Sequence, residues 1–228
     1  PLPPGAPPNL VAGRRPRGML QRRWWLWGLD RELRRLGATV FHGTNFEVPY
    51  IPRLPSVLTL HDLSPWMDPA WHRHAGRVRA RTPLLIELNC ATLVVTGTEA
   101  VRRQAMARFR ISPGRIVAVP LGGLPPPACP PPCAPAAASP YFLFVGTLEP
   151  RKNIETLLEA WRLVRRRSPV ELVLVGRRRR DFPPLRPEPG LRILGEVPDA
   201  GLPPLYAGAL ALVYPSRYEG FGLPVLEA

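Results

Sequence analysis

The stretch YPSRYEGFGLPVLEA, Tyr214 to Ala228, determines how the rest of the chain is interpreted. The apolar run before it, Leu210 to Tyr214, predicts a buried parallel strand, and a loop rich in Pro, Ser and Gly follows. Pro224 stands where a first helical residue is tolerated, so the predicted order is strand, loop and helix start. In an open α/β sheet this junction lies at the carboxyl edge, where ligands bind and a helix end presents N–H groups to an anion.

Two acids mark this stretch, Glu219 in the loop and Glu227 about one turn into the predicted helix. Gly220 and Gly222 lie on either side of Phe221, so the backbone can approach a ligand closely there. Taken alone, the two acids are best explained as a helix-capping carboxylate and an exposed helical residue.

A second stretch, FVGTLEPRKN from Phe144 to Asn153, lies about seventy residues upstream. It predicts a strand over 141–146, a loop over 147–152, and a helix whose apolar stripe is Ile154, Leu157, Leu158 and Trp161. Asn153 is a suitable N-cap, which places Arg151 and Lys152 beside the positive end of that helix. This position favours phosphate binding over the alternative, a basic pair on the surface.

The first half of the chain carries two histidines near the ends of predicted strands. Strands over 38–41 and 57–60 are followed by His42 and by His61–Asp62. Residues just past a strand's carboxyl end face the ligand-binding edge of a doubly wound sheet, so His61 is a candidate for chemistry. A structural role is the alternative for His61, and the two roles are about equally favoured for His42.

Further helices and strands continue the same alternation. An arginine-rich helix is predicted over 71–88, with His72 and His74 on its solvated face, and a strand over 91–96 leads to a helix capped by Thr98. Strands are also predicted over 116–119, 170–176 and 191–194, with a short helix over 202–208. The fold class is therefore α/β, with two parallel-sheet domains.

The predicted domains are separated by a proline-rich segment. Residues 1–18 have no pattern, 19–123 form a first Rossmann-like domain, 124–140 a stiff linker, and 141–228 a second Rossmann-like domain. A ligand for a proline-recognition module is the alternative role for the linker. Tryptophans 24, 25 and 27 lie on a helical stripe over 20–36; core packing is favoured over insertion into a membrane interface.

The composition restricts the possible partners only loosely. The net charge is +14, but the 31 basic residues include only one lysine, Lys152, which suggests a coding bias toward arginine. The chain has no zinc-finger spacing and no apolar run near the ~20 residues that cross a bilayer, and its three cysteines are an odd number. These features favour a cytoplasmic protein, with peripheral contact at the inner face of a bacterial plasma membrane as an option, and no nucleic-acid partner.

The spacing of Glu219 and Glu227 around GFGLPVLEA, together with EPRKN upstream, resembles the donor site of family 4 retaining glycosyltransferases. The resemblance implies a GT-B architecture, two Rossmann-like domains facing a cleft. Because the chain starts at PLPP and stops at Glu227–Ala228, both domains are expected to be incomplete. It also implies that Arg151 and Lys152 bind the diphosphate of the donor.

The same resemblance implies roles for the remaining candidates. Gly220, Phe221, Gly222 and Leu223 would line the donor site, Glu227 would bind the ribose, and Glu219 and His61 would act at the sugar as the catalytic pair. The implied reaction is metal-free transfer of a hexose, as in mannosyltransferases that use GDP-mannose, to a glycan or lipid-linked hydroxyl. No cofactor is implied besides the nucleotide-sugar substrate.

Two alternatives to this function stay open at the level of sequence. One is a non-enzymatic basic module that binds anionic membrane or nucleic acid, and the other is an inactive glycosyltransferase remnant.

Overall fold

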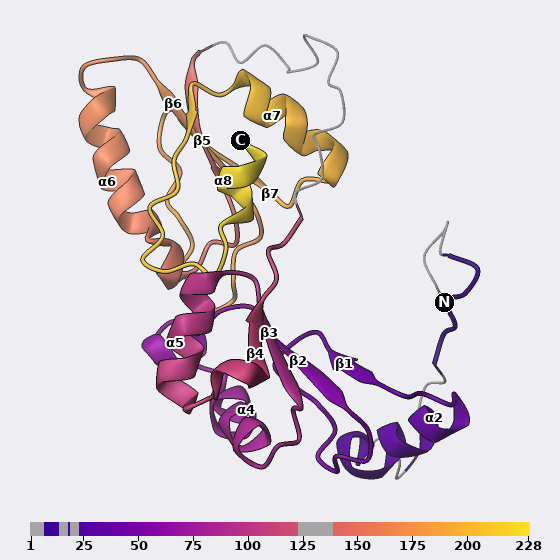
Figure 1. Cartoon of the computed structure of the whole chain (residues 1–228). Helices are drawn as coiled ribbons and strands as arrows, with labels where there is room; N and C mark the ends of the chain where they lie inside the picture. Colours follow the sequence, from indigo (N-terminus) through magenta and orange to yellow (C-terminus); the bar gives the residue numbers. More distant parts are fainter. Residues whose placement is uncertain (1–6, 14–17, 19–22, 123–138) are drawn as a thin grey trace. The chain divides into compact units, whose positions relative to one another are not determined.

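The computed structural model describes residues 7–13, 18, 23–122 and 139–228 (Figure 1). The chain divides into two compact units, of which the second contains Ser64–Arg73 as well as the residues from Leu121 onward. The sequence did not indicate that Ser64–Arg73 belongs with the second half of the chain. Most of the unpatterned segment 1–18 and of the linker 124–140 lies outside the described residues, so the domain boundaries stay a prediction.

The first unit is built on a parallel sheet in the order β1-β2-β3-β4. Its strands are β1 (Phe41–Gly43), β2 (Ser56–Leu60), β3 (Leu93–Thr96) and β4 (Ile116–Ala118). Its helices are α2 (Leu29–Arg35), which follows a π-helical turn at Trp24–Gly28, α4 (Gly76–Glu87) and α5 (Glu99–Phe109), and a short 3-10 turn at Pro113–Arg115 leads into β4. Alternate residues of β2, namely Ser56, Leu58 and Leu60, are buried, so one face of this strand packs into the core.

Several local predictions for this unit are confirmed and others are shifted. The Thr98 hydroxyl accepts a hydrogen bond from the Val101 backbone N–H at 3.2 Å, so Thr98 caps α5 as predicted. Strand β1 begins at Phe41 instead of residue 38, which puts His42 inside the strand.

The predicted helix over 71–88 begins only at Gly76, and the prediction of a solvated His72 is wrong. Its ring Nε2 lies 2.7 Å from the Ser64 hydroxyl, in the second unit. A short helix that the sequence did not predict, α3 (Ser64–Met67), supplies this partner.

The second unit has a parallel sheet in the order β7-β6-β5-β8. Its strands are β5 (Tyr141–Val145), β6 (Glu171–Val175), β7 (Leu191–Gly195) and β8 (Ala211–Leu212). Its main helices are α6 (Ile154–Arg165), α7 (Leu202–Gly208) and α8 (Leu223–Glu227), with 3-10 turns at Pro150–Lys152 and Asp199–Gly201. Two parallel sheets with their helices confirm the predicted α/β class.

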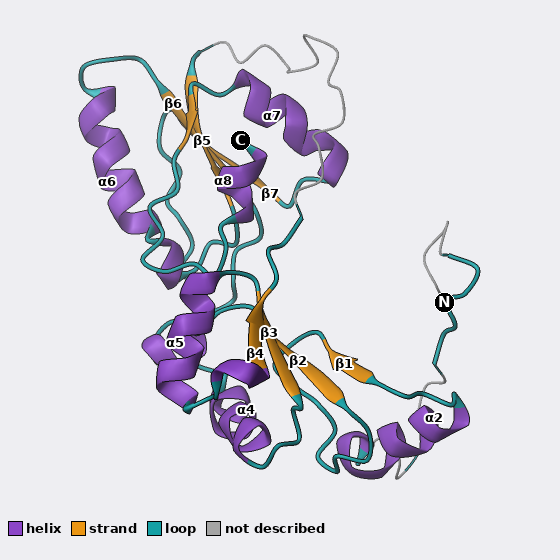
Figure 2. Ribbon diagram, in the orientation of Figure 1, coloured by secondary structure: helices purple, strands orange, loops and turns teal. Residues whose placement is uncertain are grey.

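The two faces of this sheet have separate cores. Phe144, Leu172 and Leu174 pack with α6, whose four predicted stripe residues are all buried. Tyr141, Leu143, Val173 and Val175 point the other way and pack against residues of α7. Figure 2 accordingly shows α6 and α7 on opposite sides of the strands.

Strand β8 is less buried than its sequence predicts. Leu210 is 62% exposed and the strand itself has two residues, Ala211 and Leu212. The reason is its place in the sheet, because among the described residues it pairs only with β5. An apolar run cannot tell an edge strand from a central one.

The strand order has a consequence for ligand binding. The chain leaves β5 through α6 toward β6 and β7, and it then returns through α7 to β8 on the other side of β5. The order therefore reverses between β5 and β8, and in open α/β sheets such a reversal leaves a crevice at the carboxyl ends of the two strands.

Candidate functional site

The loops that follow β5 and β8 are joined at this reversal point. The Arg217 backbone N–H donates to the Arg151 carbonyl at 2.9 Å, and the Asn153 amide donates to the Pro215 carbonyl at 3.3 Å. Asn153 stands at the N-cap position of α6 as predicted, and its carbonyl accepts from the Leu157 N–H, but its backbone is left-handed and its side chain makes no capping bond. Its side chain ties the two loops together instead.

The three charged residues singled out in these loops lie in direct contact. Glu219 accepts a hydrogen bond from Arg151 Nη1 at 2.9 Å through Oε2, and one from Lys152 Nζ at 2.6 Å through Oε1. Arg151 Nη1 also donates to the Tyr218 carbonyl at 2.7 Å. The predicted phosphate-binding pair and the predicted sugar-binding acid are therefore parts of one cluster.

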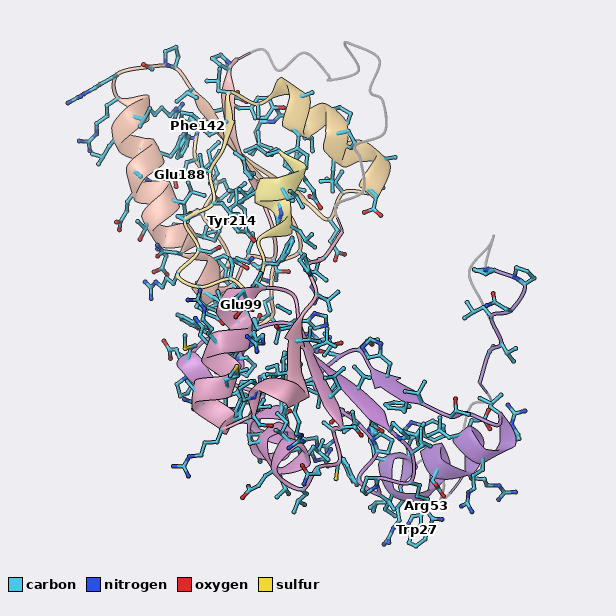
Figure 3. The ribbon with its side chains drawn as sticks, viewed as in Figure 1. Trp27, Arg53, Glu99, Phe142, Glu188 and Tyr214 are labelled. Atoms are coloured by element: carbon cyan, nitrogen blue, oxygen red, sulfur yellow. The ribbon has the colours of Figure 1, made fainter. Side chains whose placement is uncertain are left out.

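Lys152 is the most enclosed charge in this cluster. The residue is only 6% exposed, and its ammonium donates to the Tyr214 hydroxyl at 2.5 Å. Burial lowers the pKa of Lys152 below its ordinary value, and the hydrogen bond to Glu219 opposes that shift. Burial likewise raises the pKa of the Tyr214 hydroxyl, so Tyr214 is a neutral partner. Tyr214, which Figure 3 labels, is a site residue that the sequence did not single out.

Glu219 is ionised in this environment. Burial by itself would raise its pKa, but the hydrogen bond from Lys152 and the charge of Arg151 outweigh that effect and hold the pKa below the ordinary value. The cluster thus combines a fixed carboxylate with two cations at the end of two parallel strands. Such an arrangement can bind a group that carries both phosphate oxygens and hydroxyls.

A second acid, Glu149, supports the cluster from the side of β5. Its carboxylate accepts from Arg151 Nε and Nη2 at 3.1 and 2.8 Å, and from Arg179 Nη1 at 2.8 Å. Arg179 also donates to Asp181 at 2.5 and 3.1 Å, and this pairing lowers the pKa of Asp181. Arg179, in the loop after β6, is therefore held between two carboxylates.

Glu227 lies on α8 and is bonded to the preceding helix. The Tyr206 hydroxyl of α7 donates to Glu227 Oε2 at 2.8 Å. Between Glu219 and Glu227, Gly222 has a left-handed φ of 92°, which favours glycine at the start of α8. The same turn contains Gly220 and Phe221, and α8 begins at Leu223, so the predicted succession of loop and helix start is confirmed.

His61 lies in the first unit, directly after β2 as predicted. Its Nε2 is 2.6 Å from the Thr44 carbonyl, so this nitrogen must donate and Nδ1 is left to face other partners. The ring also packs edge-on against Phe46. The remaining candidates, from Arg151 to Glu227, all lie in the second unit.

Within the described residues, no group of three or more His, Cys, Asp or Glu side chains is placed to hold a metal ion. Cys90 is buried with a free thiol, and Cys129 and Cys133 lie outside the described part of the chain. The helices that the structure describes are all too short or too polar to cross a membrane.

Two α/β units with a charged cluster at a strand reversal match the GT-B class of glycosyltransferase structures. The Anabaena protein HepE, solved with UDP and glucose, aligns with a TM-score of 0.66 at 18% identity, over 92% of this chain and 62% of its own. WaaG, a glycosyltransferase involved in lipopolysaccharide biosynthesis, aligns with a TM-score of 0.62 at 18% identity, over 88% and 59% of the two chains.

Sequence comparison identifies the family. The profile described as Glycosyltransferase Family 4 matches residues 3–122, and the profile described as Glycosyl transferases group 1 matches residues 139–228. The chain belongs to glycosyltransferase family 4.

The curated relatives are mannosyltransferases. The Escherichia coli O-antigen chain mannosyltransferase B is 40% identical over 210 residues, which are 83% of this chain and 54% of that protein. The E. coli serotype-specific mannosyltransferase WbdA is 35% identical over 136 residues, 55% of this chain and 16% of its own. The chain therefore spans about half the length of the first of these relatives and a smaller part of the second.

Proposed function

We propose that this protein is a retaining glycosyltransferase that moves mannose from GDP-mannose to a hydroxyl of a glycan or lipid-linked acceptor. The observation that carries the proposal is the contact of Arg151 and Lys152 with Glu219 at the reversal between β5 and β8. Family membership and the mannosyltransferase relatives support it, and the donor sugar is inferred from those relatives and from the sequence motifs.

The proposed chemistry follows from the charges of the cluster. The leaving group of the reaction is a nucleoside diphosphate, so the barrier falls where developing negative charge meets donors that are already in place. Arg151 and Lys152 supply two such donors, and the backbone around Gly222 and Leu223 supplies further N–H groups. Because these donors neutralise the leaving group, the proposed reaction needs no metal ion or other cofactor.

The two carboxylates are proposed to bind different parts of the donor. Glu227 is proposed to bind the ribose hydroxyls, since a carboxylate accepts two hydrogen bonds. Glu219 is proposed to hold the hexose and to stabilise positive charge at its anomeric carbon. His61 is proposed to bond a sugar hydroxyl through Nδ1, the nitrogen left over when Nε2 donates to Thr44.

The proposed setting is the cytoplasm of a bacterium, with the acceptor presented at the inner face of the plasma membrane. Peripheral contact with anionic lipid is compatible with the net charge of +14. Salt-dependent binding to vesicles, with no such binding to neutral lipid, is the corresponding test.

The experiment that tests the function is a thermal-shift titration against GDP, UDP, ADP and their hexose conjugates without added metal. A ligand at about 100 times its dissociation constant stabilises a fold by about 2.7 kcal/mol, which is a measurable shift. We expect GDP and GDP-mannose to stabilise the chain more than the other nucleotides at equal concentration. Equal shifts from all nucleotides, or none from any, would count against a donor site and favour the basic-module or remnant alternatives.

A further inference from the structure

Glu149 is a buried acid in a place where the family motif draws attention only to the bases that follow it. The residue is 6% exposed and lies two positions before Arg151, in the loop between β5 and α6. A carboxylate at this depth is costly unless it is paired, and here both of its oxygens are paired with arginine. The role of Glu149 therefore follows from what it does to these two arginines.

The two arginines use Glu149 in different ways. Arg151 turns one edge of its guanidinium, Nε and Nη2, onto Glu149 Oε1, which leaves Nη1 for the Tyr218 carbonyl and Glu219. Arg179, in the loop after β6, donates from Nη1 to the other oxygen of Glu149. The Nε side of the Arg179 guanidinium donates to Asp181. A planar guanidinium held along one edge has its remaining N–H groups fixed in direction.

The backbone holds these two loops in the same register. The Leu148 N–H donates to the Arg177 carbonyl at 2.9 Å, and the Arg179 N–H donates to the Leu148 carbonyl at 3.1 Å. The side-chain bridge through Glu149 therefore spans loops that are already fixed to each other. It holds the Nε and Nη2 edge of Arg151, while the Tyr218 carbonyl and Glu219 hold Nη1, so the guanidinium is fixed in direction from both sides.

We propose that Glu149 is a positioning residue, anchored by Arg179, that aims Arg151 at the diphosphate of the donor. The inference rests on the proposed function, because it assigns Arg151 to that group. A fixed donor loses less rotational freedom on binding than a flexible one, so the bridge raises affinity for the phosphates without touching them. It extends the donor site from two strand-end loops to three.

The test compares Glu149→Gln with the wild-type chain by calorimetry. Glutamine keeps the shape, but its amide nitrogen can only donate, and one of the two arginines must then face another donor. We expect an affinity loss of about tenfold or more for GDP or UDP, whichever the wild-type chain binds more tightly. Glu188→Gln is the matched control, since Glu188 accepts a similar two-point bond from Arg162 beside α6 (Figure 3) and is expected to leave the affinity unchanged.

A second comparison separates positioning from a merely structural role. If Glu149 acts through Arg151, then Glu149→Gln has no further effect on affinity in an Arg151→Ala background. A structural role would instead lower the melting temperature equally in both backgrounds and leave the ratio of diphosphate to monophosphate affinity unchanged. That result, or wild-type affinity in Glu149→Gln, overturns the inference.

Arg179→Gln keeps the proposal testable where Glu149→Gln does not fold. Its side chain is 22% exposed, so its removal leaves a smaller defect, and we expect a weaker but measurable loss of diphosphate affinity. Unchanged affinity in a folded Arg179→Gln variant would show that Arg179 does not anchor Glu149 for binding, and it would overturn the proposal. A wild-type chain that binds neither GDP nor UDP would overturn the proposed function as well, whereas equal binding by wild type and variants would overturn only the role of Glu149.

Discussion

Lys152 is the one lysine among 31 basic residues, and it is also nearly buried. Its ammonium has two partners in the structure, Tyr214 and Glu219. We expect Lys152→Ala to weaken GDP binding by about 1.5–3 kcal/mol, the range for a hydrogen bond to a charged group. Calorimetry measures this directly, and Arg162→Ala, a change on the surface of α6, is the control. An unchanged dissociation constant would remove Lys152 from the site.

Substitution of Glu219 is expected to lower the rate of transfer more than the affinity for GDP. The Glu219→Gln variant keeps a hydrogen-bond acceptor for Arg151 or Lys152 but carries no charge to stabilise the anomeric carbon. We expect transfer from GDP-mannose to slow by at least ~100-fold while GDP still binds, since general electrostatic stabilisation of this kind acts on the transition state. Radiolabelled transfer and calorimetry give the two quantities. A loss of GDP affinity as large as the loss of rate would contradict this division of roles.

The lowered pKa of Glu219 also predicts how the stability of the fold depends on pH. The pKa of Glu219 is lowered in the folded state, so its contribution to the free energy of unfolding is complete above the ordinary glutamate pKa, near 4.5, and is lost as the pH falls below that value. We expect the melting temperature to fall below pH 4.5 in the wild-type chain and to fall less steeply in Glu219→Gln. Parallel curves for the two proteins would show that the ion pairs of Glu219 do not contribute.

At this scale the sequence predicted the charged residues better than their partners. Arg151, Lys152 and Glu219 were found because each follows a strand within a recognisable motif. Glu149 stood inside the same motif, and an acid directly before two bases at a strand end is a signal that could have found it. Tyr206 offers no such signal, because its contact with Glu227 arises only when α7 and α8 pack together.

Helix α6 shows how far one element can be predicted, and it offers a test. Its stripe at i, i+3, i+4 and i+7 gave both the helix and its buried face. Trp161 is 2% exposed and its indole donates to the Val170 carbonyl, so Trp161→Ala should lower the free energy of unfolding by about 3–5 kcal/mol. Leu163→Ala, 60% exposed on the same helix, should stay within about 0.5 kcal/mol of wild type. Equal denaturation midpoints would contradict the packing.

Short strands and turns were harder to predict than α6, for a physical reason. The apolar run around β8 correctly predicts a strand. The pattern does not encode that the strand has only two residues or that it lies at the edge of the sheet. Helix α3 has only four residues and owes its place to contacts such as that between Ser64 and His72. Elements of this size depend on tertiary contacts that local periodicity does not report.

The whole molecule has a charge of +14, and the charge alone would also suit a protein that binds polyanions. The two functions differ in how many phosphates are contacted at once. Binding that neutralises 6–10 phosphates loses about 10³–10⁵ in affinity between 50 and 200 mM salt, and the loss scales with the number of contacts. A nucleoside diphosphate has no condensed layer of counterions to release, so its binding to a site built from Arg151 and Lys152 should weaken far less over the same range.

We therefore expect raised salt to separate the two kinds of binding in one preparation. At 200 mM salt GDP should still stabilise the chain in a thermal-shift assay, and its preference over ADP should be unchanged, because ADP carries the same charge. Any binding to duplex DNA seen by fluorescence anisotropy at 50 mM salt should be lost. If DNA binding persists while the preference for GDP disappears, the charge of the whole surface, and not the cluster at β5 and β8, is the functional feature of this protein.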